Sequence, residues 1–389
     1  MQNKAFGVLF DLFKYEINGT ELNQETKNLI SPETEIALYK LSKKHDLAHL
    51  VADALDKNGL LDDSEIAKIF RNERNMAVYR YEQINYELGE ICRVLEENKI
   101  EHIPLKGAVL RAHYPQPWMR TSCDIDILVK KDELKQAITV LFKELSYKKE
   151  QENSHDVQLW APSGVHLELH FNLVEERYKP ESVRILESVW DRVVPVDGKT
   201  YQKEMTDEMF YFYHLVHMVK HFIEGGCGLR SFMDLWILNH KKTFDTQKRT
   251  ALLKQGELSS FANIVETLAD IWFLNERHTD TTRKLETYIL NGGVYGNSEN
   301  KNLVRRSKHK NKFSYFMSRL FMPYEQLCFD YPKLIHRKWL YPFYTVKRWW
   351  KKIFKGKAKS ALNEVKEASK LSDESIQGLK ELMQDLGLK

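Results

Sequence analysis

The segment DIDILV at positions 124–129 constrains the fold of this chain more than any other stretch of its sequence. Polar and apolar residues alternate in its first half and the second half is fully apolar, which is typical of a strand with one face in a protein core. Side chains two residues apart on a strand share a face, so Asp124 and Asp126 point to the same side, opposite the isoleucines. The segment therefore predicts a sheet that carries two carboxylates on one face.

Further strand signals surround this segment. The run HIPLKG (102–107) is short, apolar and closed by glycine, and the strand-like runs at 155–161 and 165–174 are separated by a Ser-Gly turn. Residues 131–145 carry apolar side chains at helical spacing. Together these segments predict a small α/β unit with mixed strands.

The rest of the chain has a helical pattern. Apolar residues recur at spacings of three and four before residue 98 and after residue 203, and residues 66–98 are expected to form one long helix. We expect an α+β fold in which a small mixed-sheet core is flanked by N-terminal and C-terminal helical regions. The 389 residues are enough for two or three domains. The predicted parts are an N-terminal helical region (1–98), the α/β core (99–200), a helical domain that forms the wall of a cleft (201–300) and a basic, aromatic helical region (301–389).

The composition excludes several classes of protein. Hydrophobic residues make up 42% and aromatic residues 12% of the chain, which is too much apolar matter for a disordered chain. The four cysteines are isolated and form no CxxC pair, which argues against a disulfide scaffold or structural zinc site and favours a reducing, cytoplasmic compartment. We find no signal peptide and no apolar run of about 18 residues, so we expect no membrane-spanning helix.

A third carboxylate belongs to the same α/β unit. Glu168 lies on the polar face of the strand at 165–174, between His166 and His170. If this strand is adjacent to the one at 124–129, three carboxylates converge and repel one another, and a hard cation such as Mg²⁺ would keep them ionised. Two such ions about 3.5–4 Å apart can clamp the attacking and leaving oxygens of a phosphoryl transfer. The alternative is that the two aspartates form only the exposed face of an edge strand.

These segments resemble a known superfamily. IPLKG (103–107), YPQPWMRTSCDIDILV (114–129) and VHLELHFNL (165–173) are similar to the nucleotidyltransferase superfamily with the polymerase-beta-type fold, and more closely to an uncharacterised bacterial nucleotidyltransferase family. A weaker resemblance to that family extends over 210–240. The resemblance implies a Mg²⁺-dependent enzyme that moves a nucleoside monophosphate from a nucleoside triphosphate, with ATP as the expected donor, to an unidentified acceptor and releases pyrophosphate. Two Mg²⁺ ions are expected, with Mn²⁺ as a substitute. The catalytic and metal-binding residues would be Asp124, Asp126 and Glu168.

The resemblance also implies which residues bind the nucleotide. Lys106 and Gly107 match the turn that faces the phosphates, where the superfamily usually has Gly-Ser or Gly-Gly. Glycine allows close backbone approach to a phosphate, and lysine supplies a point charge. Arg120 matches the basic position ahead of the carboxylates. His170 shares the strand face of Glu168, where it would contact the nucleotide or accept a proton, or would be a hydrogen-bonded strand histidine with no role in chemistry.

Two other functions are compatible with the same residues. A phosphotransferase would use the same metal site, since the same clamp serves either transfer. The other alternative is a non-catalytic nucleotide-binding protein whose basic tail binds a membrane or a partner. The presence of all three carboxylates argues against this second alternative.

The predicted helix at 208–223 carries His217 and His221, which share a face because they are four residues apart. Arg230 and Asp234 have the same spacing on the next predicted helix. Two histidines at this spacing can bind zinc, but HMVKH lacks the glutamate of the HExxH motif, so we expect polar contacts at a domain junction rather than zinc. The other interpretation is that all four residues line the substrate or nucleotide cleft.

Charge is distributed unevenly along the chain. The formal net charge is +4, but residues 301–360 contain 17 Lys and Arg against two acidic residues, which leaves the rest of the chain acidic. Aromatic residues are interleaved with lysines in 343–359. Three interpretations are open: contact with an anionic membrane surface, which would add a peripheral membrane location; binding of single-stranded nucleic acid; or packing of the aromatics on the helical domain, with solvated lysines. We favour packing and membrane contact over nucleic acid.

Overall fold

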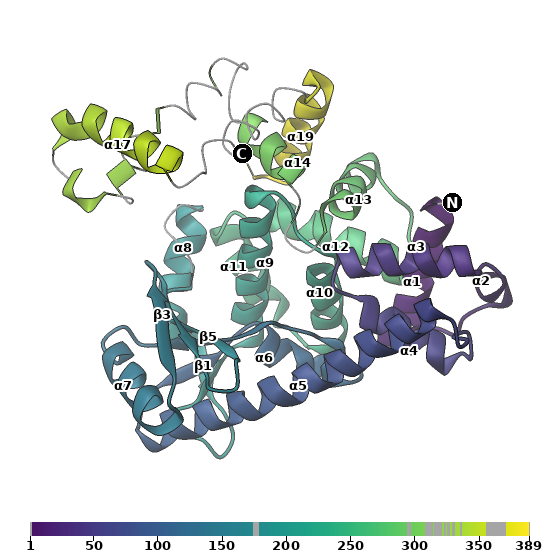
Figure 1. Cartoon of the computed structure of the whole chain (residues 1–389), viewed down its shortest axis with the longest axis horizontal. Coiled ribbons are helices and arrows are strands. Elements are labelled where there is room, and N and C mark those ends of the chain that lie inside the picture. Colours follow the sequence, from purple (N-terminus) through teal and green to yellow (C-terminus); the bar gives the residue numbers. More distant parts are fainter. Residues whose placement is uncertain are drawn as a thin grey trace.

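The structure is a computed structural model. It describes residues 2–173, 179–293, 296, 298–307, 314, 321–322, 324, 327–328, 331–334, 337–354 and 371–388 (Figure 1). Much of the predicted basic segment between 308 and 336, together with 355–360, therefore lies outside the described residues.

The N-terminal part of the chain is helical, as its sequence pattern predicts. The long helix α5 (Glu65–Glu97) begins after Ser64, whose hydroxyl accepts a hydrogen bond from the N–H of Ala67, and it ends at Asn98. This confirms the single helix expected over 66–98. The helices before it are α1 (Gln2–Asn18), α2 (Gln24–Asn28), α3 (Pro32–Lys44) and α4 (Ala48–Lys57).

A five-stranded mixed sheet follows α5. Its strand order is β1-β2-β5-β4-β3, and β2 pairs with β5 in parallel whereas the other neighbouring strands are antiparallel. Because β2 lies between β1 and β5, the alternative that it is an edge strand is wrong. The strands are β1 (His102–Pro104), β2 (Asp124–Val129), β3 (Lys148–Glu152), β4 (Asp156–Trp160) and β5 (His166–His170).

One face of this sheet is covered by α5 and by α7 (Leu134–Leu145). Ile125 and Ile127 of β2 are buried in one apolar cluster with residues of both helices and with Leu167 and Leu169 of β5. Since side chains alternate along a strand, the carboxylates of β2 and β5 point to the opposite face. Figure 1 shows α5 and α7 below the strands and α8 (Pro180–Glu187) and α9 (Asp207–Glu224) above them.

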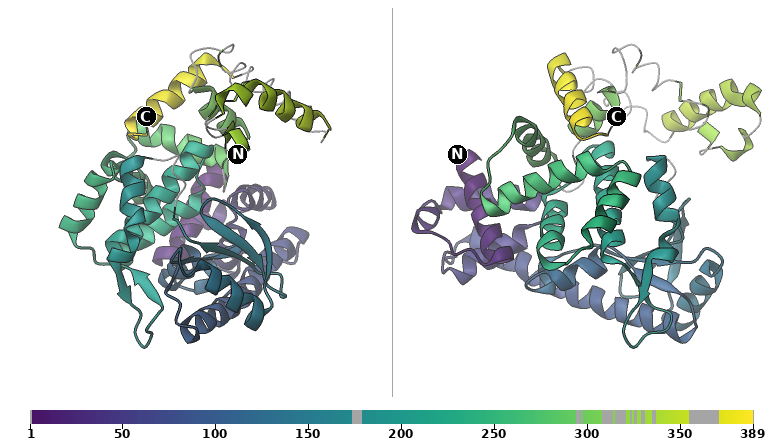
Figure 2. Two further views of the ribbon diagram at one scale, coloured as in Figure 1. Left: turned by 90° about the vertical axis from the view of Figure 1, so that its left-hand side faces the viewer. Right: turned by 180° about the vertical axis from the view of Figure 1, so that it is seen from behind.

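The helical regions before and after the sheet share a second apolar cluster. Buried side chains of α1 and α4 belong to the same cluster as those of α9, and the rings of Phe10 and Trp272 are stacked with centroids 5.0 Å apart. Figure 2 shows the N-terminal helices, in purple, beside green helices that follow the sheet in sequence. The arrangement confirms the expected α+β fold, a small mixed sheet flanked by helices.

The other helices up to residue 292 are α6 (Gly107–Leu110), α10 (Leu229–Lys241), α11 (Thr246–Gln255), α12 (Ser259–Leu274) and α13 (Asp280–Gly292). A two-stranded sheet consists of β6 (Val193–Pro195) and β7 (Lys203–Met205).

The described residues after α13 include three further helices. They are α14 (Ser298–Ser307), α17 (Tyr341–Phe354) and α19 (Asp373–Asp385). None of the helices in the described part of the chain is both long and apolar enough to cross a membrane.

Candidate metal and nucleotide site

The parallel pairing of β2 and β5 brings the three predicted carboxylates together. Asp126 lies opposite Glu168 in the strand register, and Asp124 lies opposite His166. The convergence that the sequence predicts for adjacent strands is therefore confirmed. Among the described residues, two groups could hold a metal ion, and within each group the candidate ligand atoms lie within 4.8 Å of one another. The groups are Asp124, His166 and Glu168, and Asp126, Glu168 and His170.

Asp126 is buried and receives two hydrogen bonds from cationic side chains. Nζ of Lys106 and Nε2 of His170 both donate to its Oδ1 atom, at 2.7 and 2.8 Å. Burial by itself would raise the pKa of Asp126, but Lys106 and His170 outweigh it and hold that pKa well below its usual range. Burial also opposes the charged form of His170, but hydrogen bonds to Asp126 and Glu168 raise its pKa. Asp126 is therefore held ionised between Lys106 and His170.

Asp124 has the opposite electrostatic environment. Burial and the charge of Asp126 raise its pKa to about 6, against the opposing effect of Lys106. The pKa of Glu168 is lowered, chiefly by its hydrogen bond with His170. Asp124 is thus the carboxylate whose ionised form gains most from a further positive charge, which is the property expected of a metal ligand.

The backbone of Lys106 adopts a conformation that favours glycine. Its φ is 45° and its ψ is −115°, at the position just before α6. The N–H of Leu105 donates to the carbonyl of Asp126 at 2.9 Å, which ties this loop to β2. A non-glycine residue in such a conformation costs about 1–3 kcal/mol, and such strain often occurs at functional sites. The chain thus has lysine, in contact with Asp126, at a backbone position that favours glycine.

Gly107 has little room for a side chain. A Cβ atom at this position would lie 3.3 Å from Cβ of Ser122, tighter than most real contacts. Arg111, which our sequence analysis missed, donates from Nε to the carbonyl of Gly107 at 2.8 Å and from its terminal nitrogen to Oγ of Ser122 at 2.9 Å. Burial and the nearby Arg120 lower the pKa of Arg111 to about 10. Its position four residues after Gly107 is the signal that could have identified it.

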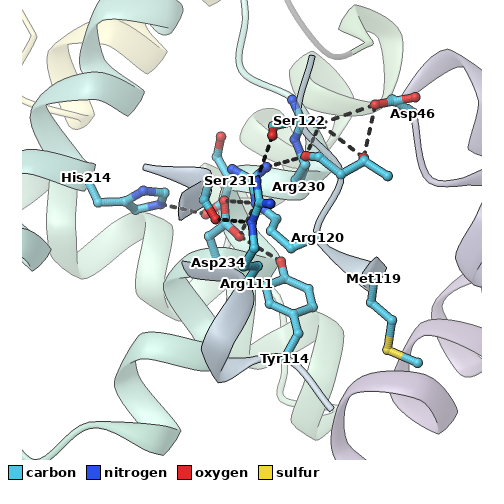
Figure 3. Close-up of polar contacts among 12 residues, drawn as sticks. Asp46, Arg111, Tyr114, Met119, Arg120, Ser122, His214, Arg230, Ser231 and Asp234 are labelled. Carbon is cyan, nitrogen blue, oxygen red and sulfur yellow. Dashed lines mark hydrogen bonds and ion pairs between the residues drawn. The ribbon is translucent and has the colours of Figure 1, made fainter. Parts of the chain in front are cut away.

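Arg120 is directed at α10 (Figure 3). Its Nε atom donates to both carboxylate oxygens of Asp234, at 2.7 and 3.0 Å, and the hydroxyl of Tyr114 donates to the same carboxylate at 2.7 Å. The side chains of Arg120 and Asp234 are only 10% and 1% exposed. Burial would raise the pKa of Asp234, but Arg120 holds it below its usual value. Arg120 was predicted to bind the nucleotide and Asp234 to line the cleft; the structure pairs them with each other.

Arg230 connects α10 to two other parts of the chain (Figure 3). It donates to Oδ2 of Asp46 at 3.2 Å and to the carbonyl of Thr121 at 3.1 Å. Nε2 of His214 on α9 lies 3.0 Å from the carbonyl of Ser231. These are polar contacts between regions distant in sequence, as the junction interpretation expects.

His217 and His221 lie on α9, within the electrostatic influence of Lys106. Their ring centroids are 4.5 Å apart. Burial and the charge of Lys106 lower the pKa of His221 to about 4, and burial, His221 and Lys106 hold that of His217 well below its usual value. Over the described ranges, neither histidine belongs to a group of three ligands that could hold a metal ion.

Tyr213 on the same helix also belongs to the site, and sequence reasoning missed it. Burial raises the pKa of its hydroxyl, and Lys106, Asp126, Glu168 and Asp124 all act on that pKa electrostatically. The ring of Tyr213 lies 6.4 Å from that of His217. Residues 213, 217 and 221 are four apart, so the spacing of the histidines could have revealed it.

The site thus consists of a mixed sheet with three carboxylates and a lysine, and a helix with aromatic and histidine side chains. This arrangement is compatible with a metal-assisted transferase of phosphorus-containing groups. Residues 32–274, more than half of the chain, match the model of a family described as uncharacterised nucleotidyltransferase, and the chain belongs to that family. All of the site residues above lie within the match, and the basic segment 301–360 lies beyond it. The comparisons with curated proteins and with solved structures give no match.

Proposed function

We propose that this protein transfers a nucleoside monophosphate from a nucleoside triphosphate, with ATP as the donor, to an acceptor hydroxyl or phosphate, with release of pyrophosphate. The observation that carries the proposal is the parallel pairing of β2 with β5, which gathers Asp124, Asp126 and Glu168 beside Lys106. Membership of the nucleotidyltransferase family supports it. A place in the polymerase-beta-like superfamily, a bacterial source and a cytoplasmic location, favoured by the four free cysteines, are parts of the same proposal.

The donor set fits a hard divalent cation. Three carboxylates share one face of the sheet, and the pKa of Asp124, raised to about 6 by burial and by Asp126, indicates negative charge that is not fully balanced. Mg²⁺ prefers such oxygen ligands, and Mn²⁺ accepts them as well. We propose that Asp124, Asp126 and Glu168 hold the metal. When bound, it would stabilise the developing charges on the attacking and leaving oxygens of the phosphoryl group.

Side chains of the protein would then accept the proton and stabilise the charges of the reacting groups. Glu168 would take the proton of the acceptor hydroxyl as its oxygen forms a bond to the α-phosphorus. The bond between the α-phosphorus and the bridging oxygen breaks, and the electron pair leaves with pyrophosphate. Lys106 would stabilise the charge of the phosphates, Gly107 would let the backbone approach them, and His170 would keep Asp126 ionised.

Helix α9 is proposed as the wall of the cleft opposite the sheet. Tyr213, His217 and His221 interact electrostatically with Lys106, so a nucleotide bound at Lys106 would lie beside them. Because burial keeps both histidines neutral, they would act as hydrogen-bonding groups and not as cations. Arg230 and Asp234 are proposed to fix the position of α10 behind this wall. In this proposal the helical part at 201–300 forms the cleft wall for the core at 99–200.

The fate of the phosphates of ATP tests the proposal. The full chain is incubated with Mg²⁺, a fractionated bacterial extract as the source of acceptors, and ATP labelled at either the α- or the γ-phosphate. The expected result is α-label on an acceptor and γ-label in pyrophosphate. Transfer of γ-label to the acceptor would identify a phosphotransferase, and nucleotide binding without release of pyrophosphate would identify a binding protein.

Matched variants connect that activity to the site. Asp124→Ala and Asp126→Ala should abolish transfer while the protein stays folded by circular dichroism. Asp132→Ala removes an exposed aspartate of the same core region and should retain full transfer. Full activity in both site variants would overturn the proposed mechanism.

A further inference from the structure

Helix α17 and the turn before it present an apolar row to solvent. The row consists of Trp339, Phe343, Val346 and Trp350, which are 78%, 62%, 65% and 63% exposed. Their spacings of four, three and four residues place them on one face, as in an amphipathic helix. In such a helix this face is normally the buried one, so its exposure calls for a physical explanation.

A different side of the helix packs against neighbouring residues. Thr345 and Arg348 are buried, and the hydroxyl of Tyr341 donates to the carbonyl of Met322 at 2.7 Å. The ring of Tyr344 lies 4.9 Å from that of Tyr331. Two sets of side chains are thus distinguished in this segment: Tyr341 and Tyr344, which contact the chain at residues 322 and 331, and the apolar row, which faces outward. Figures 1 and 2 show α17 at the edge of the molecule, away from the sheet.

The surroundings of the apolar row are strongly basic. Residues 331–359 contain ten Lys and Arg and no acidic residue. Lys338 and Lys347 are exposed next to members of the row. A second copy of the chain would bring like charges together at this face. Single-stranded nucleic acid would satisfy the charges and stack on the rings, but Val346 would gain little from it. An anionic bilayer offers both negative headgroups and an apolar layer directly below them.

We propose that α17 binds flat on an anionic lipid surface, with the apolar row inserted at the boundary of headgroups and acyl chains and the exposed Arg337, Lys338 and Lys347 against the headgroups. The inference concerns where the protein acts and does not depend on the proposed transfer reaction. The basic region lies beyond the family match, so this property would belong to the chain and not to the family core.

Cosedimentation of the full chain with vesicles tests the proposal. Vesicles of phosphatidylglycerol and phosphatidylcholine in equal parts should bind the protein, and vesicles of phosphatidylcholine alone should bind it at least about tenfold more weakly. High salt should weaken binding without abolishing the contribution of the apolar row. Equal binding to both kinds of vesicle, or binding to neither, would overturn the proposal.

A matched pair of double variants distinguishes insertion of the apolar row from non-specific binding through any exposed aromatic side chains. Trp339→Ser with Phe343→Ser should lower affinity for the anionic vesicles by about tenfold or more, because two aromatic side chains leave the interface. Tyr79→Ser with Tyr86→Ser removes two aromatic residues of α5 that are 62% and 70% exposed, and it should leave binding unchanged. Equal loss in both pairs, or loss in neither, would contradict insertion.

Nucleic acid is the competing partner, and one measurement decides between the two. Single-stranded oligonucleotides should bind the wild-type chain and the Trp339→Ser, Phe343→Ser variant equally, through charge alone. If the oligonucleotides bind more tightly than the vesicles and that binding needs the two aromatic residues, the segment is a nucleic-acid site and the lipid proposal is wrong. All substituted side chains are exposed, so the variants should unfold at the wild-type temperature.

Discussion

Nζ of Lys106 lies 2.7 Å from Oδ1 of Asp126, and this ion pair connects the loop after β1 to the carboxylates of β2. Lys106→Met would leave the buried carboxylate with His170 as its remaining cationic partner. We expect loss of about 2 kcal/mol of stability and at least a hundredfold loss of nucleotide affinity, because the variant also removes the charge that we propose to lie beside the phosphates. Urea unfolding and binding of a fluorescent ATP analogue measure the two effects.

Lys130→Met is the control for that variant. Lys130 forms an ion pair with Glu101 in the same core region, but its side chain is 39% exposed. Exposed pairs contribute about 0–1 kcal/mol, so both measurements should change little. A Lys106→Met protein with wild-type stability and nucleotide affinity would show that the contact with Asp126 has no role.

The backbone conformation of Lys106 can be tested separately from its side chain. Lys106→Gly and Lys106→Ala both remove the ammonium group, but only glycine adopts a φ of 45° without steric cost. We expect the glycine variant to be more stable than the alanine variant by about 1 kcal/mol. An alanine variant more stable than the glycine variant by about 0.4–1 kcal/mol would mean that the backbone at this position carries no strain, because glycine has more entropy in the unfolded chain.

The pair of Arg120 and Asp234 gives a prediction about stability. Both side chains are buried, and Arg120→Met would leave Asp234 with the hydroxyl of Tyr114. Loss of one partner of a buried pair costs about 3–5 kcal/mol, whereas Arg120→Met with Asp234→Leu should cost much less than the sum of the single variants. Urea unfolding of the two single variants and the double variant measures this coupling.

The same variant tests the nucleotide-binding role that the sequence predicts for Arg120. If the role of Arg120 is only to pair with Asp234, the folded Arg120→Met protein should bind the ATP analogue about as tightly as the wild type. A loss of affinity at a temperature where the variant is fully folded would instead support direct contact with the nucleotide.

The raised pKa of Glu266 leads to a prediction of how the free energy of unfolding depends on pH. It lies on α12 and accepts a hydrogen bond from the hydroxyl of Tyr211 on α9. Burial and the charge of Asp270 raise the pKa of Glu266 from 4.5 to about 7. The folded protein therefore binds this proton more tightly than the unfolded chain does, so the contribution is complete below pH 4.5 and is lost as pH rises to about 7.

Glu266→Gln isolates that contribution. The wild type should lose up to about 3 kcal/mol more stability than the variant when pH is raised across this interval, at 1.36 kcal/mol per unit of pKa. Glu65→Gln, at an exposed position on α5, should follow the wild type. The same pH slope in Glu266→Gln and the wild type would mean that Glu266 keeps an ordinary pKa.

Much of the candidate site could be predicted from local sequence. The alternation in β2 placed Asp124 and Asp126 on one face, and the motif at 103–107 pointed to Lys106 and Gly107. Sequence could not show that Arg120 pairs with Asp234, which lies 114 residues away. It also missed Tyr213 and Arg111, because their importance comes from neighbours on other elements.

The apolar row of α17 likewise has one property that the sequence predicts and one that only the structure shows. Its spacing could be read from the chain, since helical geometry places residues three and four apart on one face. Only the structure shows that this face points outward while Tyr341 and Tyr344 pack inward.

The sequence by itself thus determined the elements of this protein, the face of β2 that carries the carboxylates, and its family resemblance. Backbone geometry fixes these locally, because side-chain direction repeats every two residues in a strand and about every 3.6 in a helix. The tertiary structure decided that β5 lies parallel to β2, which partners balance each buried charge, and which apolar face stays exposed. Those outcomes depend on how distant segments pack together, because the desolvation of a charge or an apolar surface is set by the neighbours that surround it.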